Sequence, residues 1–187
     1  MQDRITLLRE DYRALEGKYD KLVSIEMIEA VGHEYLNGFI KICSARLHNH
    51  GRALIQAILM PDHDFDDYKK SVDFIQKYIF PGGALPSLSA ITMAVRQHSD
   101  LSFNSLHDIS LDYAHTLRDW RHAFLSHSEK IRELGYPEEF IRMWEYYFCY
   151  CEGGFTERII TTAQLVFDKP GCRLPVDIRP VTPLTHY

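Results

Sequence analysis

The hydrophobic positions of the chain switch between the spacing of strands and the spacing of helices. Short apolar runs at residues 4–9 and 22–25 predict two strands, and apolar residues recur at helical spacing from residue 26 to residue 48. Three turn-forming residues are predicted to end that helix, Asn49, His50 and Gly51. Residues 52–61, RALIQAILMP, are almost continuously apolar, which is typical of a strand buried on both faces of a parallel sheet. The order strand, helix, strand predicts an α/β sheet.

The rest of the chain continues this alternation. An acidic and aromatic segment at residues 62–87 ends in turn-forming prolines and glycines, and it predicts a helical insertion over the ligand-binding edge of the sheet. The pattern then predicts helices at residues 87–96, 113–134 and 138–159 and strands at residues 101–108 and 162–167. Ser87 or Ser89 is suited to cap the first of these helices. We expect one domain over residues 1–170 and an irregular proline-rich tail over residues 171–187.

Composition and charge narrow the class of function. The 187 residues are 45% hydrophobic and 25% charged, which is enough to bury one core. The net charge of -5 disfavours binding to nucleic acid and electrostatic adsorption to an anionic membrane, whereas apolar contacts can still bind a lipid. The first ten residues carry charges and no long apolar run, and no segment reaches the length of a membrane span, so we expect a cytoplasmic protein.

The cysteines and histidines do not predict a metal site. The four cysteines include no CxxC pair, which favours reduced, buried thiols at Cys43, Cys149, Cys151 and Cys172. The ten histidines include no HExxH motif. We therefore expect no structural metal.

Two acidic residues stand where open α/β sheets bind their ligands. In residues 21–32, KLVSIEMIEAVG, a strand pattern breaks into the start of a helix that carries Glu26 and Glu29. The plain interpretation of Glu29 is a solvated carboxylate in the first helical turn, favoured by the helix dipole. The residues before this run contain no glycine-rich turn of the kind that holds a cofactor phosphate or ribose.

Five segments carry a family resemblance, VSIEMIEAVG, LIQAILMPD, DFIQKYIFPGGALPS, DYAHTLRDW and IRMWEYYFCYCEGGFTERIITTAQLVF. From about residue 3 to residue 170, the chain resembles the C-terminal portion of the cyclopropane-fatty-acyl-phospholipid synthases and the related mycolic-acid cyclopropane synthases. The resemblance implies a partial class I S-adenosylmethionine-dependent methyltransferase fold, a Rossmann-like sheet that lacks its first strands. It also implies methylene transfer to the double bond of an unsaturated phospholipid acyl chain, with peripheral membrane contact as one option.

The resemblance also assigns roles to single residues. Glu29, Tyr113 and the backbone of Ile58 match family residues that hold a bicarbonate ion, which removes a proton after methyl transfer. Taken alone, a tyrosine that opens a helix more often packs than catalyses. Gln56 replaces the family's histidine and can donate a hydrogen bond but cannot titrate, so both ring closure and methyl branching remain open. Glu26 lies outside the family motif.

The cofactor site is implied only in part. Asp11, Tyr12 and Arg13 match a segment that contacts the adenine end of S-adenosylmethionine, and the alternative is an ordinary surface turn. Because the glycine-rich strand and turn are missing, we expect the chain alone to bind the cofactor poorly and to need a second polypeptide that supplies the N-terminal half. The alternative is a non-catalytic assembly module whose exposed sheet edge pairs with a partner.

The aromatic segment at residues 141–155 allows two interpretations. It predicts either an acyl-chain channel or membrane-contact surface, or a helix packed on the sheet. We favour packing on the sheet, through the stripe Ile141, Met143, Tyr147 and Tyr150.

Overall fold

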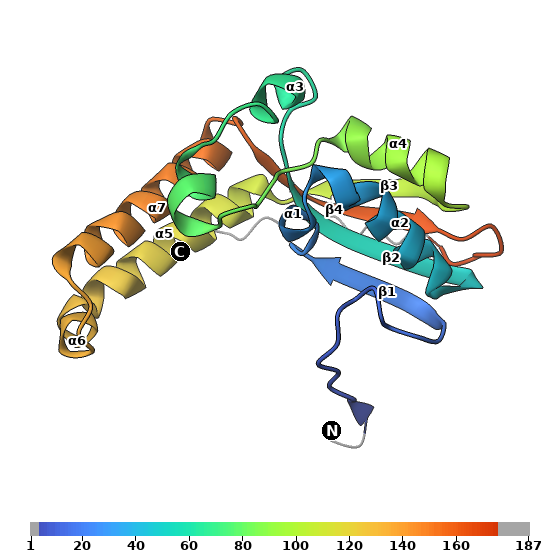
Figure 1. Ribbon diagram of the computed structural model, residues 1–187, viewed down its shortest axis with the longest axis horizontal. Helices are drawn as coiled ribbons and strands as arrows, with labels where there is room; N and C mark the ends of the chain where they lie inside the picture. The colour runs from blue at the N-terminus through green and yellow to red at the C-terminus, as the bar shows by residue number, and fades with distance from the viewer. Residues whose placement is uncertain (1–3, 176–187) are drawn as a thin grey trace.

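Four strands form one mixed sheet in the order β1-β2-β4-β3 in the computed structural model, which describes residues 4–175 (Figure 1). The strands are β1 (Tyr19–Ile25), β2 (Leu47–Leu59), β3 (Ser102–Asp108) and β4 (Thr161–Asp168). The helices are α1 (Ile28–Val31), α2 (Leu36–Ala45), α3 (Phe65–Tyr68), α4 (Leu88–His98), α5 (Ser110–Ser126), α6 (Ser128–Glu133) and α7 (Glu138–Thr156). A 3-10 turn, η2 (His33–Tyr35), and a π-helical turn, η3 (Ile75–Ile79), complete them. The predicted α/β fold is thus confirmed.

The sheet is not purely parallel. β1 runs parallel to β2, whereas β4 runs antiparallel to both β2 and β3. Along the second half of β2, fully buried side chains alternate with partly exposed ones, so only one face of the strand is completely covered. The expectation of a parallel-sheet strand buried on both faces is therefore wrong. The side chains of its apolar run instead pack against two layers, one that buries them fully and one that leaves them partly exposed.

The larger core lies between the sheet and helices α2 and α4. It contains Phe39 and Ile40 from α2, Ile91 from α4, and Ile55 and Leu165 from the paired strands β2 and β4, all with at most 1% of their surface exposed. Burying a side chain of this size contributes roughly 1.5 to 3 kcal/mol. This core fixes the sheet whose strand ends form the site.

A second, smaller core joins α5 and α7, which run side by side away from the sheet and are linked at their far ends by α6 (Figure 1). Leu117 of α5 packs with Phe148 and Phe155 of α7, and Ile58 of β2 reaches the same cluster. The partly exposed face of β2 therefore meets the helical pair. The two cores lie on opposite faces of one strand.

The predicted helix at residues 26–48 is shorter than expected and divided. Gly32 has a φ of +83°, which favours glycine, and it separates α1 from η2 and α2. β2 already begins at Leu47, so the residues predicted to end the helix lie inside the strand. A Cβ at Gly51 would lie only 3.0 Å from the His48 carbonyl oxygen and 3.2 Å from that of Asp20. This glycine therefore permits the close approach of β1 to β2 rather than a helix end.

Other predicted boundaries are corrected as well. Residues 5–9 form no strand, because no strand in the described part of the chain pairs with them. The helix expected at residues 113–134 starts earlier, at Ser110, and is divided at His127. Ser87 caps α4 by accepting a hydrogen bond from the Ala90 backbone N–H at 3.2 Å. Of the tail predicted for residues 171–187, positions 176–187 lie outside the described residues.

Candidate active site

The ends of two parallel strands bring the first site residues together. The register of β1 and β2 places Ile25 opposite Gln56, and the chain leaves β1 at the next residue, Glu26. The Glu26 backbone N–H donates to the Gln56 carbonyl oxygen at 2.9 Å, and its φ is +50°. A positive φ is uncommon outside glycine, and it turns the chain sharply into α1. The turn directs the Glu26 side chain toward Gln56.

The carboxylate of Glu26 accepts hydrogen bonds on both of its oxygens. The Gln56 side-chain amide donates to Oε1 at 2.9 Å, and the Tyr113 hydroxyl of α5 donates to Oε2 at 2.7 Å. Gln56 is itself held by Gln164 of β4, whose Nε2 donates to the Gln56 Oε1 at 3.0 Å. Burial and the bond to Glu26 both raise the pKa of the Tyr113 hydroxyl. Three strands and one helix thus orient a single carboxylate.

Glu29 has a different environment on the first turn after β1. Its Oε1 accepts the Ile58 backbone N–H at 2.6 Å, whereas its Oε2 is buried and has no hydrogen-bond partner. Burial raises the pKa of Glu29 to about 7, against an ordinary value of 4.5, and the negative charge of Glu26 adds to the shift. Near neutral pH, Glu29 is therefore poised between a neutral donor and a charged acceptor.

Both carboxylates open onto a large cavity of about 1250 Å³. Its walls come from the end of β2, the segment from η3 to Leu85, and helices α5 and α7. Its lining includes the hydrogen-bonded residues described above, Glu26, Glu29, Ile58 and Tyr113. The remaining wall is largely apolar or aromatic and includes Leu117, Tyr147, Phe155 and Ile160. The cavity can hold a long apolar ligand with one end beside the acids.

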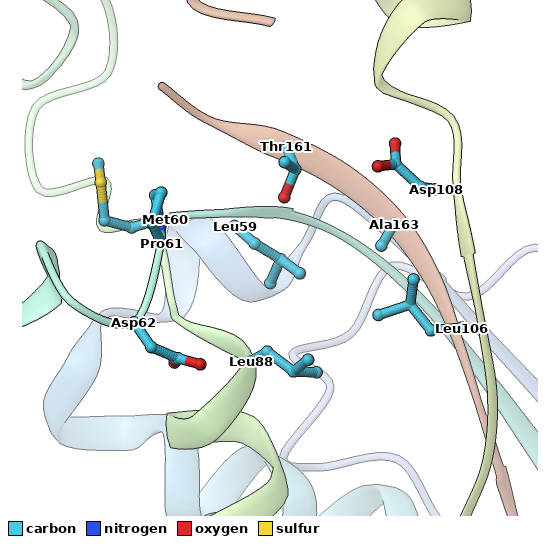
Figure 2. Close-up of a pocket in the computed structure, with 9 residues that line it drawn as sticks. All are labelled: Leu59, Met60, Pro61, Asp62, Leu88, Leu106, Asp108, Thr161 and Ala163. Carbon is cyan, nitrogen blue, oxygen red and sulfur yellow. The ribbon is translucent and has the colours of Figure 1, made fainter. Parts of the chain in front are cut away.

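A second pocket of about 140 Å³ lies near the end of β2 and the start of β4 (Figure 2). Its two carboxylates, Asp62 and Asp108, lie on opposite sides of it. Asp62 accepts the Ser89 backbone N–H, and Asp108 accepts both the backbone N–H and the hydroxyl of Ser110. Both carboxylates thus serve helix starts, and the pocket has room for only a few water molecules.

Comparison with known proteins identifies the family of this chain. Residues 1–165 match the family described as Mycolic acid cyclopropane synthetase. The chain belongs to this family. It is 39% identical over 161 residues to the tuberculostearic acid methyltransferase UfaA1 of Mycobacterium tuberculosis, a match that covers 86% of this chain and 38% of that protein. It is 34% identical over 166 residues to the cyclopropane-fatty-acyl-phospholipid synthase of Escherichia coli K12, covering 88% of this chain and 41% of that protein.

A solved structure of the family shares the fold. The mycolic acid cyclopropane synthase CmaA1, complexed with SAH and CTAB, matches with a TM-score of 0.77 at 24% identity, covering 87% of this chain and 59% of that one. The predicted class I methyltransferase fold is thus confirmed. The chain spans about two fifths of the length of these two curated relatives.

Within this family member, the predicted site residues separate into two groups. Glu29, Ile58 and Tyr113 line the cavity. Gln56 does not line it, but its side chain donates a hydrogen bond to Glu26, which does. Asp11, Tyr12 and Arg13 lie on the segment before β1, and none of the three is among the residues that line the cavity.

The segment that precedes β1 is held together by local contacts. The Arg13 guanidinium pairs with Asp11 at 2.7 Å and holds the pKa of that carboxyl at about 2. The Tyr12 ring packs edge-on against Phe39, with 5.7 Å between the ring centroids. The Tyr12 contact anchors the segment to the larger core.

Glu26 is the site residue that the sequence analysis did not assign. It lies outside the family motif, and its partner Tyr113 is 87 positions away along the chain. One local signal was present, because Glu26 directly follows a strand at the sheet edge where α/β proteins bind ligands. The decisive information is the β1–β2 register, which no local pattern contains.

The aromatic helix α7 corrects a second interpretation. It packs mainly on α5, so the expectation that this helix packs on the sheet is wrong, and of the predicted stripe only Ile141 is fully buried. Tyr147 and Tyr150 of that stripe line the cavity instead.

The cysteine thiols differ in their exposure. Cys43 is buried, as expected, whereas Cys149 is exposed, which corrects the expectation for that thiol. Among residues 4–175, no group of three histidine, cysteine or acidic side chains is placed to hold a metal ion. No helix in the same range combines the length and apolar character needed to cross a bilayer.

Proposed function

We propose that this chain forms the acyl-chain and proton-transfer part of an S-adenosylmethionine-dependent enzyme that adds a methyl or methylene group to the double bond of an unsaturated phospholipid acyl chain. The observation that carries the proposal is the cavity of about 1250 Å³ whose largely apolar wall includes Glu26, Glu29 and Tyr113. Sites for drug-sized ligands span roughly 300 to 1,000 Å³, so this one is large enough for a flexible chain.

The shape of the cavity suits the chemistry of an alkene. An isolated double bond is a weak nucleophile and reacts only when it is closely aligned in a dry pocket. Methyl transfer leaves a carbocation, which aromatic faces and carboxylates stabilise and which water would destroy. Tyr113, Tyr147 and Phe155 provide aromatic faces beside Glu26 and Glu29. The described wall therefore supplies the shielding and the negative charge that this reaction needs.

The residues present fit one end of the cofactor. S-adenosylmethionine, when bound, supplies an electrophilic methyl group on a positively charged sulfur. The carboxylates of Glu26 and Glu29 complement that charge, whereas Asp11, Tyr12 and Arg13 lie outside the cavity wall. We infer that the N-terminal half of the fold, carried on the same or on a second polypeptide, supplies the adenosine site and that residues 1–187 alone turn over little.

The exposed edge of β1 supports such a partner. β1 pairs with β2 alone among the described strands, and Val23 and Ile25 on it are 65% and 53% exposed. An unpaired strand edge readily accepts another strand. The same edge supports the second candidate function, a non-catalytic assembly module that docks on a partner without chemistry.

The rim of the cavity favours contact with a membrane. Phe80, Trp120 and Tyr146 line the cavity and are each more than half exposed. Tryptophan and tyrosine side chains are enriched at the interface between lipid and water, and phenylalanine adds apolar surface beside them. A phospholipid substrate therefore has an apolar route from the bilayer into the site.

The implied bicarbonate ion does not fit the donors of this chain. The Tyr113 hydroxyl and the Gln56 amide donate to Glu26, and the Ile58 backbone N–H donates to Glu29. An anion placed among them would meet two acidic side chains and would have to displace their bonds. We therefore derive no step through bicarbonate.

The test is lipid analysis after co-expression. The chain is produced with and without the N-terminal half of a full-length relative in cells that contain unsaturated phospholipids. We expect acyl chains heavier by one CH2 group only when both polypeptides are present, with NMR separating a ring from a methyl branch. Glu29→Ala should abolish the gain, while Glu34→Ala, on the exposed turn η2, should leave it intact. A complex that binds S-adenosylmethionine yet leaves the lipids unchanged would favour the assembly module.

A further inference from the structure

We propose that the carboxylate of Glu26 is the base that removes the proton from the substrate cation in this chain, a role that rests on the function proposed above. Three features of Glu26 carry the inference. It lines the cavity, it is held by donors from β2 and α5, and its backbone adopts an uncommon conformation. A further catalytic residue follows from these three observations together.

The hydrogen bonds of Glu26 suit a proton acceptor. Both donors, the Gln56 amide and the Tyr113 hydroxyl, are neutral groups. They orient the carboxylate and stabilise its charge. An adjacent arginine or lysine would instead neutralise that charge. Gln56 cannot turn its oxygen toward Glu26 without breaking the bond that its own Oε1 accepts from Gln164. The carboxylate is thus held beside the cavity in one orientation.

The backbone of Glu26 supports a functional placement. Its φ of +50° lies in the left-handed region, which is unfavourable for a residue with a side chain. Glycine would adopt that conformation without strain. The backbone of Glu26 is therefore locally unfavourable, and the hydrogen bonds of its side chain to Gln56 and Tyr113 hold it in place.

Glu29 is less suited to the same role. One of its oxygens accepts the Ile58 backbone N–H, and burial raises its pKa to about 7, so a large fraction carries a proton near neutral pH. Two acids whose environments differ in this way divide the work, one accepting a proton and the other donating a hydrogen bond. Glu29 remains a group that can stabilise charge through its unpartnered Oε2.

The proton step balances with the groups at hand. The substrate cation carries the new methyl group, and an oxygen of Glu26 takes a proton from it. If the proton leaves the methyl carbon, the electron pair of the broken C–H bond becomes the new C–C bond of a cyclopropane ring. If it leaves a neighbouring carbon, the pair becomes a new double bond. Cation and carboxylate become a neutral product and a neutral acid, which returns its proton to solvent before the next turnover.

The first test uses Glu26→Gly in the two-polypeptide enzyme, because glycine suits the left-handed backbone and the variant should fold. We expect a roughly 10²- to 10⁴-fold loss of product formation, the range contributed by a general base. Added formate or bicarbonate should restore product at least tenfold by entering the space left by the side chain. Glu34→Gly is the control for loss of an exposed carboxylate, and neither anion should change its rate. In buffer freed of carbon dioxide, the unsubstituted enzyme should keep its rate.

The second test needs no cofactor. In the full chain with carbon-13-labelled tyrosine, NMR should show the pKa of Tyr113 falling in Glu26→Gly while it stays above 10.0, because the bond to Glu26 is lost and burial remains. An inactive unsubstituted complex would refute the proposed function and the Glu26 role with it. An active complex in which Glu26→Gly matches Glu34→Gly, or in which removal of carbon dioxide stops the reaction, would overturn the role of Glu26 alone.

Discussion

The side-chain amide of Gln56 donates a hydrogen bond to Oε1 of Glu26 at 2.9 Å. Gln56 thus orients an acid of the chain itself. The contact exists because parallel pairing of β1 and β2 sets Gln56 opposite Ile25, next to Glu26. The register of one strand pair therefore brings the side chains of Gln56 and Glu26 together.

Gln56→Glu should harm both stability and catalysis. A second carboxylate at this position would face Glu26 at hydrogen-bond distance and lose the donor, so like charges would repel in a partly buried site. We expect a loss of roughly 1 to 3 kcal/mol in the free energy of unfolding at neutral pH and at least tenfold lower product formation. Urea unfolding and lipid mass spectrometry measure the two effects. Gln97→Glu, on the exposed side of α4, is the matched control and should change neither.

Glu29 predicts a pH dependence of stability with a definite sign. Its pKa in the folded chain is about 7, above the ordinary value of 4.5. The folded state then binds more protons than the unfolded state between these values, so this group's contribution is complete below pH 4.5 and is lost as pH rises through 7. Glu29→Gln keeps an acceptor for the Ile58 backbone N–H and cannot ionise. It should therefore gain stability over the unsubstituted chain as pH rises.

Urea unfolding of both chains between about pH 5 and pH 8 measures this effect. The difference between the two should grow in favour of Glu29→Gln across that interval. Glu34→Gln, on the exposed turn η2, should show no such trend. If the stability of Glu29→Gln and of the unsubstituted chain changed in parallel with pH, the pKa of Glu29 would not be raised in the folded chain.

The sequence was most informative where function and local pattern coincide. Glu29 and Ile58 fall in segments with a specific family resemblance, and the structure brings them into contact through one hydrogen bond. The strands at residues 22–25 and 162–167 were recognised from short apolar runs and lie within β1 and β4. Such runs are reliable when the strand has partners in the same chain.

The missed features depend on contacts between distant residues. The apolar run at residues 4–9 looks like a strand, but a strand needs a hydrogen-bonded neighbour and none is present in residues 4–175. Glu26 was not assigned because Tyr113 meets it only after α5 has packed on α7 and the sheet. Helix ends shifted for a related reason, since the approach of β1 extends β2 back to Leu47. In each case tertiary contacts override the local preference.

The core beneath the site should be sensitive to truncation. Ile55 of β2 is fully buried and lies opposite Leu165 in the β2–β4 pairing, next to Gln56 on the opposite face. Ile55→Ala removes buried methyl groups and leaves a cavity, which should cost about 2 to 5 kcal/mol in the free energy of unfolding. Met93→Ala on α4, where the side chain is more than half exposed, should cost less than about 0.5 kcal/mol. Equal midpoints of urea unfolding for the two variants would contradict the core described above.

The ion pair between β2 and β4 predicts acid sensitivity of the opposite sign to that of Glu29. Arg52 Nε donates to Asp168 Oδ1 at 2.6 Å, and both side chains are less than one fifth exposed. The bond to Arg52 lowers the pKa of Asp168 from 3.8 to about 2. Its stabilisation is therefore present above pH 3.8 and is lost as pH falls toward 2.

Asp168→Asn should lose about 1 to 3 kcal/mol of unfolding free energy near neutral pH, because it removes a charge-assisted hydrogen bond and leaves the largely buried Arg52 without its carboxylate partner. The difference from the unsubstituted chain should shrink as pH falls below about 4, where Asp168 itself begins to take up a proton. Thermal unfolding across that range is the measurement, with Asp67→Asn, on the exposed helix α3, as the control. A difference that stays constant down to the lowest pH would mean that packing, and not the ion pair, holds Asp168 in β4.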